Sequence, residues 1–284
     1  MFLKTEGKNL SGQLINSANY INGQWVVKGN GASLKILDKY NHTHLKEIPF
    51  ADESQVELAV VSAQNGFKVM KKWSAAEKVE RLQKLSQLLK ENKQAFVDLI
   101  VQEAGKPFSF ALTEVERSLA TLDGAIRETL RFSGETVPLD YGAGIGKTAF
   151  TKRFPLGVIL CITPFNFPLN LLMHKIAPAL AVGCSVIIKP PPQAPLSALA
   201  LTALINQVGY PDGAVNLINC DVSLAEKMVK DERIAMLSFT GSAKVGWYLK
   251  NICGKKKVAL ELGGNAPIII DEINHMPNIA KTIA

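Results

Sequence analysis

The sequence has few residues that bind metals or cross-link a chain. Its 284 residues include four cysteines and four histidines. The cysteines lie far apart, with no C-x-x-C pair and no histidine at metal-binding spacing, which argues against a zinc site or a disulfide framework. We therefore expect reduced, mostly buried thiols at Cys161, Cys184, Cys220 and Cys253.

Long apolar runs are also missing. No stretch approaches the roughly 20 apolar residues that span a bilayer, and the N-terminal Met-Phe-Leu-Lys-Thr-Glu-Gly-Lys lacks the apolar core of a signal peptide. These absences predict a cytoplasmic protein with no membrane partner. The composition, 47% hydrophobic and 20% charged, is typical of a globular chain with a substantial core.

Positive charge exceeds negative charge by +7, but the basic residues are scattered. They cluster only at Lys71-Lys72 and Lys255–Lys257, and neither cluster is interleaved with aromatic side chains that stack on nucleic-acid bases. We expect solvated surfaces there and no nucleic-acid partner. An anionic cofactor would be a sufficient second reason for the excess charge.

Local signals place one hairpin and three helices in residues 1–133. An Asn-Gly pair between apolar flanks predicts the hairpin. Capping boxes formed by Asp52 with Gln55 and by Ser74 with Glu77 predict the starts of two helices. The expected ranges are 20–28 for the hairpin, from 53 onward for the first helix, 74–104 for the second and 109–132 for the third.

Residues 134–152 interrupt the helical pattern with glycine and proline. Gly146-Lys147-Thr148 matches the end of a phosphate-binding P-loop, but that motif needs a glycine five positions before Gly146, where Tyr141 stands. The G-x-G-x-x-G spacing fails too, because Lys147 occupies the third glycine position. We expect a flexible hairpin arm here.

From Arg153 onward, short apolar runs alternate with helical patterns. This alternation predicts an α/β fold with a doubly wound parallel sheet and crossover helices. The expected strands are 158–162, 185–189, 214–218, 234–239 and 258–260, and the expected helices are 170–181, 195–208 and 224–229.

The stretch around Gly241 carries the strongest chemical signal. An apolar strand turns at Gly241 and opens a helix whose N-cap is Ser242. Such a helix start presents unpaired N–H groups and the positive end of a dipole, which suit a phosphate. The next strand ends at Glu261 beside Gly263-Gly264, and ligands bind at such strand ends in open α/β sheets. We infer a phosphate cradle beside a carboxylate.

Motifs are spread along nearly the whole chain in one consistent order. They are Tyr20-Ile-Asn-Gly-Gln-Trp25, Glu103-Ala-Gly-Lys-Pro107, Thr163-Pro-Phe-Asn-Phe-Pro-Leu169, Val186-Ile-Ile-Lys-Pro190, Gly209-Tyr-Pro-Asp-Gly-Ala-Val-Asn216, Phe239-Thr-Gly-Ser242 and Glu261-Leu-Gly-Gly264. Together these segments resemble the aldehyde dehydrogenase superfamily, and the spacing of five of them makes the resemblance specific.

The resemblance implies a domain plan and an activity. It implies a Rossmann-like cofactor-binding domain made of residues 1–133 and 153–263, an oligomerisation arm at 134–152, and only the start of a catalytic domain at 264–284, with its first strand at Pro267-Ile-Ile-Ile270. The parent enzyme would oxidise an aldehyde to a carboxylic acid with NADP or NAD. The complete protein would be a homodimer or homotetramer.

The resemblance also assigns roles to individual residues. Asn166 would stabilise an oxyanion, Glu261 would be the general base that activates water, and Lys175 would support the site. The residues by themselves leave other readings open, namely a turn asparagine, a surface carboxylate and a partly buried helix lysine. The cofactor-binding residues implied are Ile162, Thr163, Pro164, Phe165, Asn166, Lys189, Phe239, Gly241, Ser242, Val245 and Leu262, with Lys189 at the adenosine ribose and Ser242 at the pyrophosphate.

One departure from the family pattern concerns the cofactor. Many NAD-preferring members have a glutamate three residues after the ribose lysine, where it binds the 2′-hydroxyl. This chain has Pro192 at that position. Without the carboxylate a 2′-phosphate meets less repulsion, so we expect NADP to be accepted and even preferred.

A second departure concerns the nucleophile. The family's catalytic cysteine lies well beyond the Glu-Leu-Gly-Gly segment, and none of the four cysteines has its local pattern. The sequence therefore resembles the N-terminal part of an aldehyde dehydrogenase. The alternative is a catalytically inactive dinucleotide-binding fragment. Glu261 favours hydrolysis over transfer to coenzyme A as the last step, without excluding the transfer.

Overall fold

The computed structural model describes residues 15–27, 31–271 and 276–283. Its main sheet has seven strands in the order β11-β10-β7-β8-β9-β1-β2. Strands β7 to β11 run parallel, which confirms the predicted doubly wound parallel sheet. The strands are β1 Asn19–Ile21, β2 Gln24–Val26, β3 Ser33–Leu37, β4 His44–Pro49, β5 Thr136–Val137, β6 Ala149–Phe150, β7 Val158–Ile162, β8 Ser185–Lys189, β9 Val215–Leu217, β10 Ile234–Thr240 and β11 Lys257–Glu261.

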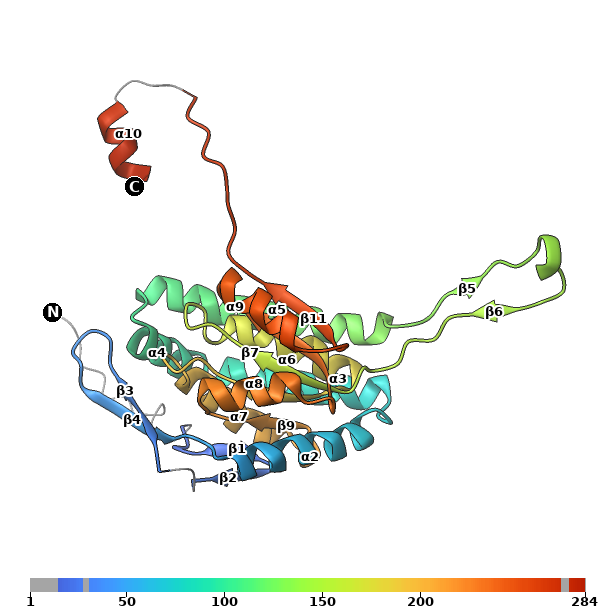
Figure 1. The fold of residues 1–284 in the computed structure, drawn as a ribbon, viewed down its shortest axis with the longest axis horizontal. Helices are drawn as coiled ribbons and strands as arrows, with labels where there is room; N and C mark the ends of the chain where they lie inside the picture. Colours follow the sequence, from blue (N-terminus) through green and yellow to red (C-terminus); the bar gives the residue numbers. More distant parts are fainter. Residues whose placement is uncertain (1–14, 28–30, 272–275, 284) are drawn as a thin grey trace.

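Helices cover both faces of this sheet (Figure 1). One apolar core lies between the sheet and α3 to α7, and another lies between the sheet and α2, α8 and α9. In β7, Cys161 belongs to the first core and Leu160 to the second, as the alternation of side chains along a strand requires. The helices are α2 Glu53–Met70, α3 Ala75–Glu91, α4 Lys93–Ala104, α5 Phe108–Arg131, α6 Asn170–Val182, α7 Leu196–Val208, α8 Val222–Lys230, α9 Ala243–Ile252 and α10 Met276–Ile283, with a 3₁₀ turn η1 at Gly142–Gly144.

The predicted helix starts are confirmed, but one predicted helix is two. Both capping boxes, at Asp52 and at Ser74, are formed. The expected continuous helix over residues 74–104 was wrong, because Asn92 separates α3 from α4. The Asn92 side-chain amide donates to the carbonyl oxygen of Leu88 at 2.8 Å, and such local bonds compete with a regular helix.

The Asn-Gly hairpin is confirmed and has a further role. Asn22 and Gly23 have positive φ angles of 51° and 79°, as a type I′ turn requires. The hairpin extends the main sheet, because Tyr20 of β1 pairs with Leu217 of β9. The sequence did not predict this pairing, which joins segments about 200 residues apart.

Residues 134–152 form the predicted hairpin arm, which projects away from the body of the molecule (Figure 1). Its strands β5 and β6 are short, and most of its large apolar side chains are exposed. Tyr141, Ile145 and Phe150 each expose at least 70% of their surface. The partner that these side chains would contact stays a prediction.

The expected strand at Pro267–Ile270 was wrong for this structure. Residues 264–271 continue away from the end of β11 and pair with no strand of the described structure (Figure 1). A strand needs a neighbour for its N–H and C=O groups, and the described part of the chain supplies none there; Ile269 is 89% exposed. Among the described residues, no helix is both long and apolar enough to cross a membrane.

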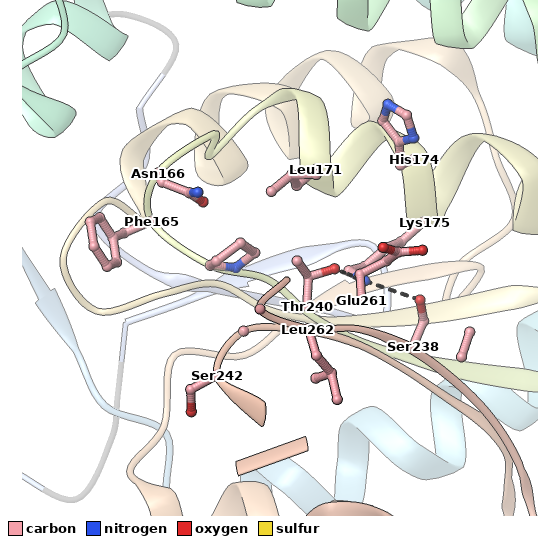
Figure 2. Close-up of a pocket in the computed structure, with 14 residues that line it drawn as sticks. Phe165, Asn166, Leu171, His174, Lys175, Ser238, Thr240, Ser242, Glu261 and Leu262 are labelled. Atoms are coloured by element: carbon pink, nitrogen blue, oxygen red, sulfur yellow. Dashed lines mark hydrogen bonds between the residues drawn. The ribbon is translucent and has the colours of Figure 1, made fainter. Parts of the chain in front are cut away.

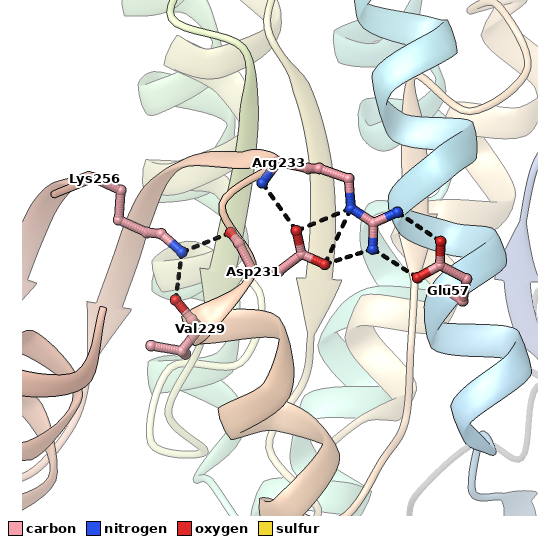
Figure 3. Close-up of polar contacts among 5 residues, drawn as sticks. All are labelled: Glu57, Val229, Asp231, Arg233 and Lys256. Atoms are coloured by element: carbon pink, nitrogen blue, oxygen red, sulfur yellow. Dashed lines mark hydrogen bonds and ion pairs between the residues drawn. The ribbon is translucent and has the colours of Figure 1, made fainter. Parts of the chain in front are cut away.

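An ion-pair cluster ties the amino end of β10 to two helices (Figure 3). The Arg233 guanidinium bonds both carboxylate oxygens of Glu57 on α2 at 2.6 Å, and it also bonds Asp231 after α8. The Lys256 ammonium donates to the carbonyl oxygens of Val229 and Asp231 at 2.5 and 2.7 Å. Both carbonyl groups lie at the end of α8, and the Asp231 oxygen also accepts from Ile234 N at 3.1 Å. The cluster therefore fixes the amino end of β10, opposite the end of the strand that precedes the Gly241 turn.

We expect Arg233→Met to lower the melting temperature by about 1–3 °C, because these partners are partly exposed and such pairs are weak. The Arg233 guanidinium lowers the pKa of both Asp231 and Glu57. Their stabilising effect is therefore complete above the ordinary pKa values of 3.8 and 4.5 and is lost as the pH falls through the lowered ones.

Thermal unfolding of both proteins between pH 7 and pH 2.5 tests this. The difference in melting temperature should be constant near neutrality and vanish at the acid end. Arg131→Met, which removes an exposed i,i+3 pair with Glu128, is the matched control and should change nothing. A difference that persists unchanged at pH 2.5 would contradict the electrostatic explanation.

Candidate active site

Two adjoining pockets lie where the strand order of the sheet reverses. After β7 the chain adds β8 and β9 on one side and β10 and β11 on the other. Such switch points are the usual ligand sites of open α/β sheets. The pockets have volumes of about 740 and 480 Å³, within the range of roughly 300–1,000 Å³ found for small-molecule sites. We call them the Glu261 pocket and the Lys189 pocket.

Asn166 lies in the loop between β7 and α6. The structure exposes it in the Glu261 pocket, and its side-chain amide makes no hydrogen bond to another described residue. Figure 2 shows Asn166 and Leu171 on one side of this pocket, with Thr240, Glu261 and Leu262 on the other. The amide is therefore available to donate to a ligand atom in the space between.

Lys175 enters the same pocket from α6. Its ammonium donates to Thr240 Oγ1 at 2.8 Å and to Ser238 Oγ at 3.2 Å (Figure 2). Burial lowers the pKa of Lys175, while Cys161 and Glu261 act in the opposite direction. The lysine thus anchors α6 to the carboxyl end of β10, and its charge faces the pocket that holds Glu261.

Glu261 is the last residue of β11, where it pairs with Thr240. Its side chain is exposed and lines the pocket. Burial lowers the pKa of His174, and the charges of Arg117 and Lys175 lower it further. The charge of Glu261 acts in the opposite direction, so it is felt by this neighbour. An exposed carboxylate at a strand end is free to accept a proton from a water molecule in the pocket.

The predicted helix start at Ser242 lies between the two pockets, and its role as a phosphate cradle stays a prediction. Ser242 is the N-cap of α9, and its hydroxyl oxygen accepts from Val245 N at 3.4 Å. Pro164, Phe165, Thr240, Gly241 and Ser242 line both pockets. Gly246 lets Leu262 approach the helix, since a Cβ on Gly246 would lie 2.3 Å from Leu262 Cδ2. The start of α9 therefore faces the junction, as a bridging phosphate would require.

The Lys189 pocket contains polar groups without partners in the described structure. The Lys189 ammonium makes no hydrogen bond there, and burial lowers its pKa, opposed by Cys220. The buried Thr163 Oγ1 also lacks a partner. Tyr248 donates to Glu226 at 3.0 Å across the rim. Unpaired polar groups in an otherwise apolar pocket are expected where a polar ligand binds.

Every residue that the sequence analysis proposed for the site lines one of these two pockets, although the role of each stays a prediction. The Glu261 pocket contains Asn166, Lys175, Glu261 and Leu262, the Lys189 pocket contains Ile162, Thr163, Lys189, Phe239 and Val245, and both contain Pro164, Phe165, Gly241 and Ser242. The sequence analysis missed Leu171, His174, Ser238 and Thr240 in the first pocket, and Gln193, Glu226, Tyr248 and Leu249 in the second. The one signal in the sequence for Ser238 and Thr240 was their spacing of two positions, which places both side chains on the same face of strand β10.

The four cysteines do not contribute to the site. All are free and buried, as expected. Burial raises the pKa of Cys161 and of Cys220 to about 12, and it also raises the pKa of Cys184. A thiol nucleophile needs a lowered pKa and an accessible sulfur. Within the described ranges, no group of three or more His, Cys, Asp or Glu side chains is placed to hold a metal ion.

Comparison with known proteins identifies relatives along nearly the whole chain. The chain is 35% identical over 267 residues to a 3-sulfolactaldehyde dehydrogenase of Priestia aryabhattai, covering 93% of this chain and 55% of the relative. It is 36% identical over 256 residues to a lactaldehyde dehydrogenase of Methanococcus aeolicus, covering 88% and 53%. The chain thus spans about half the length of the curated relatives it matches.

The fold is similar to solved structures as well. The crystal structure of an NADP-dependent glyceraldehyde-3-phosphate dehydrogenase from Bacillus halodurans C-125, complexed with NADP, superposes with a TM-score of 0.84 at 33% identity, covering 88% of this chain and 53% of that one. The model of the aldehyde dehydrogenase family matches residues 25–284. The chain belongs to the aldehyde dehydrogenase family.

Proposed function

We propose that this chain supplies the cofactor-binding part of an enzyme that oxidises an aldehyde to a carboxylic acid with NADP or NAD. The observation that carries the proposal is the meeting of three groups at one switch point. These are the helix start at Ser242, the amide of Asn166 and the carboxylate of Glu261. A cradle for phosphate, an oxyanion donor and a base are what such a reaction needs from this side of the site.

The pockets fit a nicotinamide dinucleotide. Its pyrophosphate would lie at the start of α9, and its adenosine ribose would accept a hydrogen bond from the Lys189 ammonium, which bonds no other described residue. Residues 162–166 would line the nicotinamide end, where Thr163 Oγ1 lacks a partner. The bound cofactor supplies the acceptor for the hydride that leaves the aldehyde carbon.

This chain's residues would act on the aldehyde in two steps. When a thiolate bonds to the carbonyl carbon, Asn166 donates a hydrogen bond to the oxygen that gains negative charge. After hydride loss leaves a thioester, Glu261 takes a proton from water, the water oxygen bonds to the acyl carbon, and the thiolate leaves. The Lys175 ammonium, held by Thr240 and Ser238, places a positive charge on the same side of the pocket as Glu261.

The thiol would come from outside residues 1–284, because all four cysteines here are buried. The names of the relatives make short 2-hydroxyaldehydes the first substrates to test. The exposed aromatic and aliphatic side chains of the arm support assembly into a homodimer or homotetramer.

The second candidate is a dinucleotide-binding chain without activity, and the buried cysteines favour it for the isolated residues 1–284. Calorimetric titration of this chain with NADP and NAD, together with an NADPH-formation assay on lactaldehyde, tests both. We expect binding without turnover from this chain and turnover from the protein that includes a catalytic thiol. Failure to bind either dinucleotide would refute the proposed function.

Position 192 is expected to decide the choice of cofactor. Pro192 lines the Lys189 pocket, and a Pro192→Glu variant would place a carboxylate beside a 2′-phosphate. We expect NADP to bind about 10–100-fold more weakly than to the wild type, since like charges at close range repel strongly in a partly buried site. NAD affinity should stay within about threefold or improve.

Pro192→Gln is the matched control, because it has the shape of glutamate without its charge. It should leave the NADP dissociation constant close to the wild-type value. An equal loss of NADP affinity in both variants would show that the proline itself, and not the absence of charge, matters.

A further inference from the structure

Two buried carboxylates lie in the corner between α4 and α5, outside both pockets. Glu103 is in the last turn of α4 and Glu114 is in the second turn of α5, and neither is exposed to solvent. Each reaches across to the first turn of a helix that follows a strand of the main sheet. Those helices, α6 and α7, begin directly after the loops that line the pockets.

Glu114 holds the loop that carries Asn166. Its Oε1 accepts hydrogen bonds from the backbone N–H groups of Leu169 and Asn170, at 3.0 and 3.2 Å. The N-cap position of α6 is Leu169, which has no side chain able to cap the helix. Glu114 therefore provides the cap from another element.

The same carboxylate holds the loop at a second point. Glu114 Oε2 pairs with the Lys106 ammonium at 2.5 Å, and that ammonium lies 3.4 Å from the centre of the Phe167 ring. An ammonium group is attracted to the electron-rich face of an aromatic ring, and this attraction is stronger where both groups are shielded from water. Phe167 is the neighbour of Asn166, so the contact restrains the backbone from which the Asn166 amide projects.

Glu103 holds the other loop in the same way. Its Oε2 accepts from Leu196 N at 2.6 Å, and its Oε1 accepts from Ser197 N at 2.7 Å and also from Ser197 Oγ. Helix α7 has Pro195 at its N-cap and so has no cap of its own. The loop before it, residues 190–195, contributes Pro191 and Pro192 to the Lys189 pocket.

We propose that Glu103 and Glu114 are positioning residues that fix the two ends of the cofactor cleft independently. Glu114, through Leu169, Asn170 and Lys106, sets the loop at the nicotinamide end. Glu103, through Leu196 and Ser197, sets the loop at the adenosine end. The inference rests on the proposed function, because it takes the two pockets to hold the two halves of one dinucleotide.

The cost of these carboxylates argues for a role beyond capping. A serine or aspartate at the N-cap would satisfy each helix locally and remain near water. A buried carboxylate is expensive unless it is fully bonded. Burial raises the pKa of Glu103 to about 7, although its bonds from Ser197 and Leu196 favour the charged form. What the buried arrangement adds is a rigid link from each loop to the α4–α5 corner.

The test uses the 284-residue chain, with NADP and 2′,5′-ADP as ligands. The second ligand contains the adenosine half alone. For Glu114→Gln we expect NADP to bind about 3–10-fold more weakly while 2′,5′-ADP stays within about twofold. For Glu103→Gln we expect both ligands to bind about 3–10-fold more weakly. Hydrogen exchange should quicken at the Leu169 and Asn170 amides in the first variant, and at the Leu196 and Ser197 amides in the second.

Two further variants keep the test valid if a glutamine variant misfolds. Lys106→Met removes the contact with Phe167 and should reproduce the Glu114→Gln pattern, and Ser197→Ala should reproduce the Glu103→Gln pattern in weaker form. Glu116→Gln, an exposed glutamate on α5 paired with Lys93, is the control and should leave both ligands unaffected.

The outcomes separate this inference from the proposed function. If the wild-type chain binds both ligands and the variants bind them equally well, the positioning inference is wrong and the proposed function stands. A Glu114→Gln variant that loses affinity for NADP and for 2′,5′-ADP equally, with a lower melting temperature, would show a merely structural role and also overturn it. A wild-type chain that binds neither ligand would overturn the proposed function first.

Discussion

Replacing Asn166 by alanine is expected to slow aldehyde oxidation by the complete enzyme by about 10²–10³-fold, the usual effect of removing one oxyanion donor. The Asn166 amide is exposed in the Glu261 pocket and makes no hydrogen bond to another described residue, so its loss leaves the fold unchanged. The interaction forms only as charge develops on the substrate oxygen. The loss should therefore appear in kcat rather than in cofactor binding.

Steady-state kinetics with lactaldehyde and titration with NADP measure the two effects separately. The NADP dissociation constant of Asn166→Ala should stay within about threefold of the wild type. Asn65→Ala is the control, since Asn65 is an exposed residue on α2 that bonds only Lys68 among described residues. A variant with normal kcat, or one whose whole defect lies in NADP binding, would remove Asn166 from the role proposed for it.

Replacing Gly66 by alanine is expected to lower the free energy of unfolding by about 2 kcal/mol, even though alanine is the better helix former. Gly66 is buried near the carboxyl end of α2, where the helix packs against the residues just before β9. A Cβ there would lie 2.4 Å from the backbone nitrogen of Ala214 and 2.5 Å from the carbonyl carbon of Gly213. Backbone atoms cannot swing aside as a side chain can, so α2 must move away from the sheet.

The same substitution elsewhere should have the opposite sign. Gly124 lies in α5, and a Cβ added there meets nothing within 4 Å. Gly124→Ala should therefore stabilise the protein by about 0.5–1 kcal/mol through helix propensity alone. Urea unfolding of the wild type and both variants gives the comparison. A Gly66→Ala protein as stable as the wild type would mean that α2 is not held against β9 as tightly as the structure shows.

Local signals explain why most of the secondary structure was predictable. The capping boxes at Asp52 and Ser74 and the Asn22-Gly23 turn each depend on residues no more than three positions apart. The alternation of apolar runs and helical patterns after Arg153 predicted the parallel sheet for the same reason. The two predictions that failed, the uninterrupted helix through Asn92 and the strand at Pro267–Ile270, depend on competing or missing partners.

The candidate site was predictable to the extent that it consists of motifs. Asn166, Lys189, Ser242 and Glu261 were proposed from their segments, and the structure places each of them in the lining of one or both pockets. Ser238 and Thr240, which hold the Lys175 ammonium, belong to no motif on their own. Their role depends on which face of β10 turns toward α6, and that is a property of the packed sheet.

The elements, the family and the residues proposed for the chemistry could be predicted from the sequence, because periodicity, caps and motifs are encoded within a few neighbouring positions. Which distant groups meet depends on how the elements pack. Glu103 contacts Leu196 and Ser197, and Glu114 contacts Leu169 and Asn170, across 55 to 94 residues of chain. A glutamate in a helix looks the same in sequence whether it faces water or another helix. The packing of α4 and α5 against α6 and α7 places these two carboxylates at the loops that line the pockets.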